Sequence, residues 1–284
     1  MGFRSLPLEN TRQCVIRSTD NGETWSQPIW FDSPGTFYQR SHAQAIQLPD
    51  GGILWPTYCA DQGKKQLFGA VHRSDDSGLT WRTISTIRRP EQDVDEPAVA
   101  RFKDKLLVMV SRPDGGIFLS NDDGVSWKWL AEIQPREGDS HHKYHELHAV
   151  ETEKGRLVAH IRNHNTAHAG ETLQSESEDG GRSWSVPHSI GVWGLPSHLL
   201  RLRDGRLLMS YGYRRPPYGN QARISEDEGR SWSAPVSVSA DGRGHDLGYP
   251  STVQLGDESF VTVWYERMKS SPRAVLRQAR WTLL

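Results

Sequence analysis

Side chains that could transfer protons or bind anions gather at the ends of short, apolar, alternating runs in this sequence. Those that precede such runs are Arg40, His42, Asp95, Glu96, His145, Glu146, His198, Asp246 and Tyr249. Those that follow them are Asp61, Arg112, Arg162, His164, Tyr213, Arg214, Arg215, Glu266 and Arg267. Arginine holds a carboxylate by paired, charge-assisted hydrogen bonds, while carboxylates, histidine and tyrosine exchange protons. Such a concentration of charged and aromatic side chains at corresponding positions favours a functional site over a purely structural role.

The elements that must position these residues are marked by an eight-residue motif, Ser-x-Asp-x-Gly-x-(Ser/Thr)-Trp. Its five copies occupy residues 18–25, 74–81, 120–127, 177–184 and 225–232. The Asp can accept bonds from nearby backbone N–H groups, the Gly can adopt a positive φ, and the Trp can be buried as an anchor. Each copy is predicted to be a folded-back turn between two strands.

The spacing of the five motifs indicates the architecture. Successive motif Trp residues lie 46 to 57 residues apart, and each interval contains alternating apolar runs joined by Asp- and Gly-rich turns. Such turns between alternating runs are typical of β-hairpins. Four antiparallel strands in each repeat, arranged radially, form a propeller. We therefore expect an all-β fold, with residues 1–284 forming a single β-propeller domain.

The number of blades is ambiguous at the two ends of the sequence. Five inner hairpins are expected, at residues 43–58, 98–111, 147–162, 197–213 and 250–266. The first motif is flanked only by its third and fourth strands, and the last blade has three strands and no motif. Either five blades close the ring, or a six-bladed plan has an incomplete first blade; we favour six.

Strand order predicts which loops meet. Because antiparallel strands alternate in direction, the starts of first strands and the ends of second strands lie on one face. The motif, between the third and fourth strands, must lie on the opposite face. All the residues named at the outset therefore share one face of the propeller.

Composition excludes several classes of function. The net charge is −1, from 34 basic and 35 acidic residues, which gives no electrostatic reason to expect nucleic acid or a membrane surface as partner. No apolar run approaches the ~20 residues of a membrane span, and no signal peptide is visible. The two cysteines give neither a disulfide framework nor metal-ligand spacing. The compartment and the oligomeric state stay open.

The motif, called the Asp-box or BNR repeat, resembles that of the sialidase (neuraminidase) superfamily, and three local stretches extend the resemblance. Glu146 to Val150, followed by Ile161-Arg162-Asn163, looks like the sialidase blade that supplies a catalytic Glu and an arginine. Tyr211 to Arg215 stands where a second arginine is expected. Gly248-Tyr249-Pro250-Ser251 looks like the blade that carries the nucleophile.

The resemblance implies a retaining glycoside hydrolase that acts on a carboxylate-bearing sugar, a sialoside, without a cofactor. Tyr249 would be the nucleophile and Glu146 its base, because a neutral Tyr is not repelled by the substrate carboxylate. Arg162, with Arg214 or Arg215, would hold that carboxylate. The family's first-blade Arg-Ile-Pro motif is absent, so Arg40 is the nearest candidate for the third arginine and Asp61 for the general acid. His198 is a further candidate for substrate binding.

Two other functions fit the same residues. Nine histidines lie near the predicted face, and their spacing matches no metal motif. Histidine and tyrosine could act as acid and base in another glycosidase, or in a lyase acting on a uronic acid whose carboxylate the arginines hold. The third interpretation is a propeller that binds glycans without catalysis.

Overall fold

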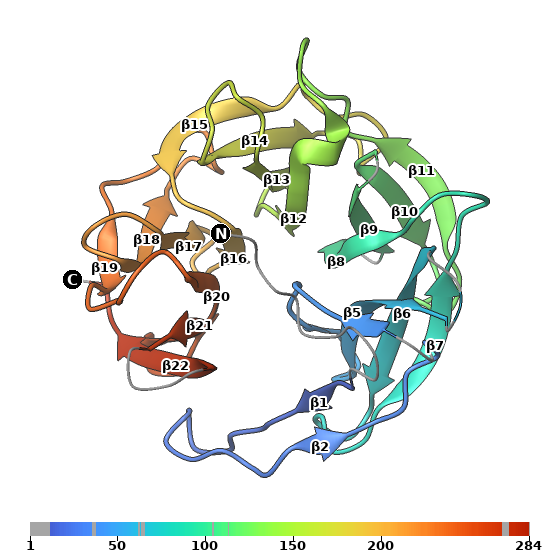
Figure 1. Ribbon diagram of the computed structural model, residues 1–284, viewed down its shortest axis with the longest axis horizontal. Coiled ribbons are helices and arrows are strands. Elements are labelled where there is room, and N and C mark those ends of the chain that lie inside the picture. Colours follow the sequence, from blue (N-terminus) through green and yellow to red (C-terminus); the bar gives the residue numbers. More distant parts are fainter. Residues whose placement is uncertain are drawn as a thin grey trace.

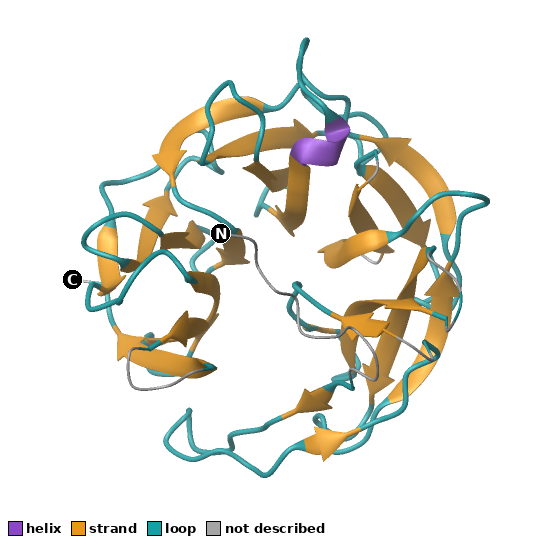
Figure 2. Cartoon of the chain, viewed as in Figure 1, coloured by secondary structure: helices purple, strands orange, loops and turns teal. Residues whose placement is uncertain are grey.

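The computed structural model describes residues 12–35, 38–61, 63, 66–103, 105–112, 114–268 and 273–283. Within them the chain is all-β, with 22 strands and one short 3₁₀ helix, η1 (His141–Lys143). Figure 2 shows how strands dominate the fold. In the part that is described, no helix is long and apolar enough to cross a membrane.

Five sheets of three to five strands stand around a central axis (Figure 1). The first contains β3 (Tyr38–Arg40), β4 (Ile46–Gln47), β5 (Ile53–Ala60), β6 (Leu67–Ser74) and β7 (Arg82–Ile87). The second contains β8 (Asp95–Phe102), β9 (Lys105–Arg112), β10 (Gly116–Ser120) and β11 (Lys128–Glu132). The third contains β12 (Tyr144–Glu151), β13 (Leu157–Asn163), β14 (Glu171–Ser177) and β15 (His188–Trp193).

The fourth sheet contains β16 (Ser197–Arg201), β17 (Leu207–Tyr213), β18 (Gly219–Ser225) and β19 (Val236–Ser239). The fifth contains β20 (Leu247–Gln254), β21 (Phe260–Arg267) and β22 (Ala274–Trp281). Consecutive strands pair antiparallel, which gives the radial blades of a propeller. The predicted all-β propeller is confirmed, and the inner strands begin up to three residues earlier than the sequence pattern suggested.

The hydrophobic core lies between neighbouring blades. One cluster joins Leu107 and Ile117 of the second sheet to Leu147 and Leu157 of the third, and all four are at most 1% exposed. A second cluster joins the first sheet to the second through Leu54 and Val99 among others. Because each strand packs against the next blade, the ends of the innermost strands are held around the axis.

The Asp-boxes fold as the sequence predicted. In the first copy, Asp20 Oδ1 accepts hydrogen bonds from Ser18 Oγ at 2.7 Å and Thr24 N at 2.9 Å. Ser18 Oγ accepts the N–H of Gly22 at 2.7 Å, and Gly22 has a φ of 89°. The other four copies repeat these bonds. The motif Trp side chains are less buried than the sequence predicted. Trp25 is 42% exposed, and the Trp residues of the other four motifs are half-buried.

The pairing registers confirm that the motifs lie away from the predicted site face. Ser177, which opens the fourth motif, pairs with Leu157 at the start of β13, whereas Asn163 at the other end of β13 pairs with Tyr144. The start of β12 and the motif therefore lie at opposite ends of the same sheet.

The six-bladed plan is not confirmed, since five blades are present. The first motif is flanked by a separate two-stranded sheet, β1 (Cys14–Val15) and β2 (Ile29–Trp30). Figure 1 shows this sheet between β22 and the first blade. Trp25 Nε1 donates to Gln278 Oε1 at 3.0 Å, and Gln278 Nε2 donates to the carbonyl of Gly22. The first motif is thus attached to the last strand of the fifth blade.

Candidate active site

Two β-bulges aim side chains toward the axis. In β12, His145 pairs with Arg162 but His148 pairs with His160, so β12 has one extra residue in this interval. In β20, Gly248 pairs with Tyr265 and Ser251 with Val263, which is the same irregularity. Glu146 and Tyr249 lie in these bulges with φ values of 40° and 54°. Bulges and left-handed non-glycine residues are enriched next to functional sites, where they redirect a side chain.

The two redirected side chains meet. Tyr249 Oη donates a short hydrogen bond to Glu146 Oε1. Arg162 Nη1 lies 2.8 Å from Glu146 Oε2 and 3.0 Å from Tyr249 Oη, so one guanidinium contacts both partners. The side chain of Glu146 is only 4% exposed. A tyrosine, its hydrogen-bonded carboxylate and an arginine from three strands thus form one buried cluster.

Their protonation states follow from this arrangement. Burial alone would raise the pKa of Glu146, but the charge of Arg162 and the hydrogen bonds from Tyr249 and Arg162 hold that pKa below its ordinary value. Burial and the neighbouring Glu146 carboxylate raise the pKa of Tyr249. Glu146 is therefore an anion at neutral pH and Tyr249 is a neutral phenol. A carboxylate in this state can act as a base toward a neighbouring phenol.

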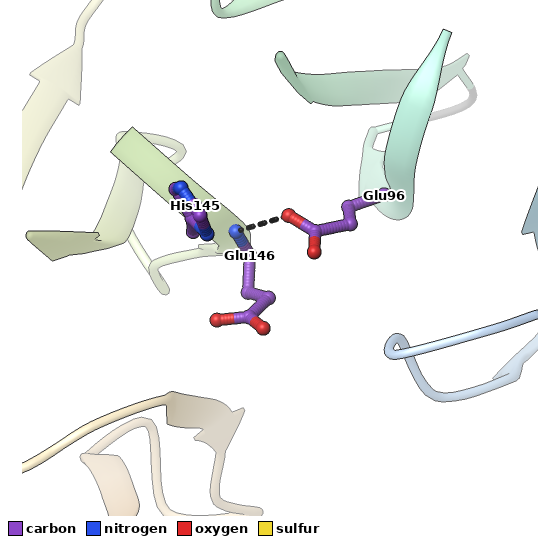
Figure 3. A group of neighbouring side chains, drawn as sticks. All are labelled: Glu96, His145 and Glu146. Atoms are coloured by element: carbon purple, nitrogen blue, oxygen red, sulfur yellow. Dashed lines mark hydrogen bonds between the residues drawn. The ribbon is translucent and has the colours of Figure 1, made fainter. Parts of the chain in front are cut away.

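Glu96 in β8 also has a left-handed backbone conformation, with a φ of 51°. Its side chain contacts the cluster. Glu96 Oε2 accepts the backbone N–H of Glu146 at 3.3 Å (Figure 3), and Oε1 lies 3.0 Å from Arg112 Nη2. Burial, and next the charge of Glu146, raise the pKa of Glu96 to about 7. Two neighbouring carboxyls therefore differ in protonation, one anionic and the other half-protonated near neutral pH.

The structure distinguishes Arg214 from Arg215. Arg214 Cζ lies 5.9 Å from the centre of the Tyr249 ring, while Arg215 Cζ stacks 3.6 Å above the ring of Trp193. Among the described residues, Arg214 Nε and Nη2 are buried nitrogens without a hydrogen-bond partner, as are Arg162 Nε and Arg112 Nε. Buried guanidinium donors that lack a partner are costly unless a ligand accepts from them. Arg214 is thus the arginine of this pair that lies beside Tyr249.

His198 lines a cavity of about 120 Å³ next to the Tyr249 cluster. The cavity is bounded by His42, His148, Glu146 and Tyr249 among others. His148 Nδ1 accepts the N–H of Leu199 at 3.1 Å, so its proton is on Nε2, which has no partner among the described residues. Burial lowers the pKa of His198 to about 3, and burial, opposed by Glu146, lowers that of His42 to about 4. Neutral imidazoles therefore line part of this cavity.

Arg40 and Asp61 lie apart from this cavity. Arg40 is an exposed residue of β3 that pairs with Tyr58, and Asp61 follows β5 and forms an ion pair with Arg88 at 3.5 Å. Neither residue lines the cavity that contains Glu146 and Tyr249. Their roles stay predictions from the resemblance.

The rim of the site carries a histidine pair and a possible metal-ligand group. The rings of His145 and His164 lie 4.6 Å apart, and burial first of all lowers the pKa of His145 to about 4. Ligand atoms of Glu96, His145 and Glu146 all lie within 4.8 Å of one another (Figure 3). The guanidinium of Arg112 already pairs with Glu96, and that of Arg162 pairs with Glu146. These positive charges disfavour a bound cation between the two carboxylates.

Sequence reasoning placed Glu96 and Arg112 on the correct face but gave them no role. The available signal was position: Asp95-Glu96 and His145-Glu146 begin the first strands of consecutive blades. The contact of Glu96 with Glu146 crosses between blades, so strand periodicity within one blade does not reveal it.

The fold and this cluster define a sialidase-like β-propeller, and comparison with known proteins agrees. A family model described as "BNR repeat-like domain" matches residues 7–135 and 116–263. The chain therefore belongs to the BNR repeat-like family, and the resemblance to the sialidase superfamily is confirmed.

Curated relatives are distant glycosidases. A sialidase from Bacteroides fragilis is 26% identical over 132 residues, which is 43% of this chain and 24% of that protein. A xyloglucanase from Acetivibrio thermocellus is 28% identical over 139 residues, 40% of this chain and 16% of that protein. The matches thus span about a quarter or less of these relatives.

Solved structures show the same fold over most of the chain. A Dyadobacter fermentans protein of unknown function superposes with a TM-score of 0.80 at 25% identity, covering 97% of this chain and 85% of the other. The NanB sialidase of Streptococcus pneumoniae gives a TM-score of 0.68 at 13% identity, covering 94% of this chain and 63% of the other. These likenesses show that the chain has the propeller fold of these proteins.

Proposed function

We propose that this protein is a retaining glycoside hydrolase that acts on a carboxylate-bearing sugar, a sialoside. The observation that carries the proposal is the partly buried hydrogen bond from Tyr249 to Glu146, with Arg162 in contact with both. A tyrosine nucleophile suits a substrate with a carboxylate on its anomeric carbon, because an anionic nucleophile would be repelled. Sialidases are glycosidases that use such a nucleophile.

Each residue has a role that its surroundings support. Glu146, an anion, takes the phenolic proton of Tyr249 as the phenolic oxygen attacks the anomeric carbon. Arg162 stabilises the negative charge that moves between the two oxygens. Arg162 and Arg214 carry buried nitrogens without partners among the described residues, and these nitrogens suit the substrate carboxylate. His198 faces the adjoining cavity, where it suits a polar part of the sugar.

The blade plan also belongs to this proposal. Gln278 contacts the first motif as Gln174 of β14 contacts the fifth: Gln174 Nε2 donates to Gly229 O, and its Oε1 accepts from Trp232. β14 belongs to the third blade and the fifth motif to the fourth, so Gln174 joins one blade to the motif of the next. Gln278 of the fifth blade contacts the first motif in the same way, and this supports β1 and β2 as the outer strands of a sixth blade. Arg40 and Asp61, the remaining arginine and acid candidates, are kept as predictions from the resemblance.

The test is hydrolysis of a fluorogenic aryl α-sialoside, with a proton NMR assay of the anomer that is released first. We expect turnover by the wild type, first release of the α anomer, and loss of turnover in Tyr249→Phe. Tyr265→Phe is the matched control, because its ring packs 5.7 Å from that of Tyr249 while its hydroxyl bonds Asp246. No release by the wild type, or full activity of Tyr249→Phe, would refute the proposal.

A second candidate, a lyase acting on a uronic acid, is favoured by the neighbouring pair His145 and His164, whose ring centres lie 4.6 Å apart. The lowered pKa values of both imidazoles, caused first by burial, leave them neutral and able to accept a proton at pH 7. A rise in ultraviolet absorbance on a uronate polysaccharide, with no sialoside turnover, would support this function. Binding of glycans without any turnover would instead indicate a non-catalytic propeller.

A further inference from the structure

The proposed hydrolase needs a group that protonates the leaving oxygen, and Tyr249, Glu146 and Arg162 cannot provide it. Glu146 is the base for Tyr249 and is held as an anion. Arginine does not release its proton in proteins. Asp61 forms an ion pair with Arg88 at 3.5 Å. The acid must therefore be sought among the other carboxyls of the site.

Glu96 is in position for this role. Its carboxyl has an oxygen within 4.8 Å of a Glu146 oxygen, and Glu146 in turn bonds the Tyr249 hydroxyl. The Glu96 side chain extends from β8 toward Glu146 (Figure 3). Its backbone has a left-handed φ of 51°, as do Glu146 at 40° and Tyr249 at 54°. Three first strands thus each redirect one acid–base side chain to the same region.

We propose that Glu96 is the general acid and base of this site, an inference that rests on the proposed hydrolase function. In the first step the bond from Tyr249 Oη to the anomeric carbon forms and the bond to the leaving oxygen breaks. The leaving oxygen takes the proton of Glu96, and Glu146 takes the proton of Tyr249. In the second step the oxygen of a water molecule bonds to the anomeric carbon, and the bond from that carbon to Tyr249 Oη breaks. The proton of the water goes to Glu96, and the Tyr249 oxygen recovers its proton from Glu146.

The charges around Glu96 suit a carboxyl that gives and regains a proton. Arg112 from β9 faces it, as do Asp95 from its own strand, His145 and Glu146 from β12, and Tyr249 across the axis. Burial, Glu146 and Asp95 favour the neutral acid, while Arg112 favours the anion, and together they raise the pKa of Glu96 to about 7. An acid is most effective when its pKa lies near the working pH.

The experiment compares Glu96→Gln with the wild type on two substrates that differ in leaving group, a 4-methylumbelliferyl sialoside and sialyl-lactose. Protonation matters most for the poorly leaving sugar hydroxyl. We expect Glu96→Gln to lose roughly 10²- to 10⁴-fold in kcat/KM on sialyl-lactose, the usual contribution of an acid, and far less on the aryl sialoside. Glu151→Gln, at the far end of β12, is the matched control.

A second measurement uses only the wild type, so it holds even if Glu96→Gln fails to fold. The kcat/KM for sialyl-lactose should fall as the pH rises above about 7, because the acid is then deprotonated, whereas the aryl sialoside should show a weaker fall. Equal losses of Glu96→Gln on both substrates, or none, would overturn the role of Glu96. If Asp61→Asn, and not Glu96→Gln, loses far more activity on sialyl-lactose than on the aryl sialoside, the acid is Asp61. A wild type that cleaves neither substrate refutes the hydrolase itself.

Discussion

Glu146 and Tyr249 come from blades that are not neighbours, yet both lie in a β-bulge with a left-handed backbone and share one hydrogen bond. The blade built from β16 to β19 separates them in the sequence. Their contact therefore depends on the packing of three consecutive blades as well as on the two bulges. A phenol whose pKa is raised becomes a nucleophile only with a base in contact.

Replacing Glu146, the proposed base, should strongly reduce turnover without unfolding the protein. Glu146→Gln keeps the shape of the side chain but cannot take the proton of Tyr249, so we expect a loss of about 10²- to 10⁴-fold in kcat on an aryl sialoside. The loss should appear at every pH between 5 and 8. Thermal unfolding of the variant is the control for folding, and undiminished kcat in a folded Glu146→Gln would contradict the role of Glu146 as base.

Arg214 and Arg215 should differ sharply in their effect on substrate affinity. Arg214→Ala removes the guanidinium whose Nε and Nη2 have no partner among the described residues, so KM should rise by about one to two orders of magnitude. Arg215→Ala removes a stack on Trp193 and should change KM little. Calorimetric binding of free sialic acid gives the same comparison without turnover. Equal effects of the two variants would show that Arg214 does not contact the carboxylate.

The propeller could be predicted because its signals are local. The Ser, Asp and Gly of each Asp-box bond within five residues, and the Asp- and Gly-rich turns close hairpins between neighbouring strands. The site is only partly predictable for the opposite reason. Period-two alternation cannot place Glu146 or Tyr249, because a bulge shifts the register by one residue. Likewise, the contact of Glu96 with Glu146 joins two blades and leaves no mark in either strand's pattern.

Two glutamines that bridge blades to Asp-boxes should differ in their contribution to stability. Gln174 is 1% exposed and bonds both Gly229 and Trp232, so Gln174→Ala leaves buried groups unpaired. We expect it to lower the free energy of unfolding by about 1–3 kcal/mol. Gln278 makes the matching bonds to Gly22 and Trp25 but is exposed, and Gln278→Ala should cost about 0.5 kcal/mol or less. Urea unfolding of both variants measures the difference; equal losses would mean that burial does not set the cost.

Buried histidines should make the protein acid-labile. Burial lowers the pKa of His72 and of His160 to about 4, against about 6.5 in an unfolded chain. Above pH 6.5 both states are neutral and the effect vanishes; as the pH falls from 6.5 to 4, the unfolded state binds protons first and stability is lost. The melting temperature should therefore fall steeply across this window and be nearly constant from pH 7 to 8.

One variant isolates the contribution of His72 to this acid lability. Its two ring nitrogens bond Thr57 Oγ1 at 2.9 Å and Thr83 Oγ1 at 3.1 Å, and an amide can replace both bonds without taking up a proton. His72→Gln should therefore lose less stability between pH 6.5 and 4 than the wild type, with a difference of at most about 3 kcal/mol. The exposed His142→Gln should leave the slope unchanged. A slope in His72→Gln equal to that of the wild type would show that this imidazole does not resist protonation in the folded state.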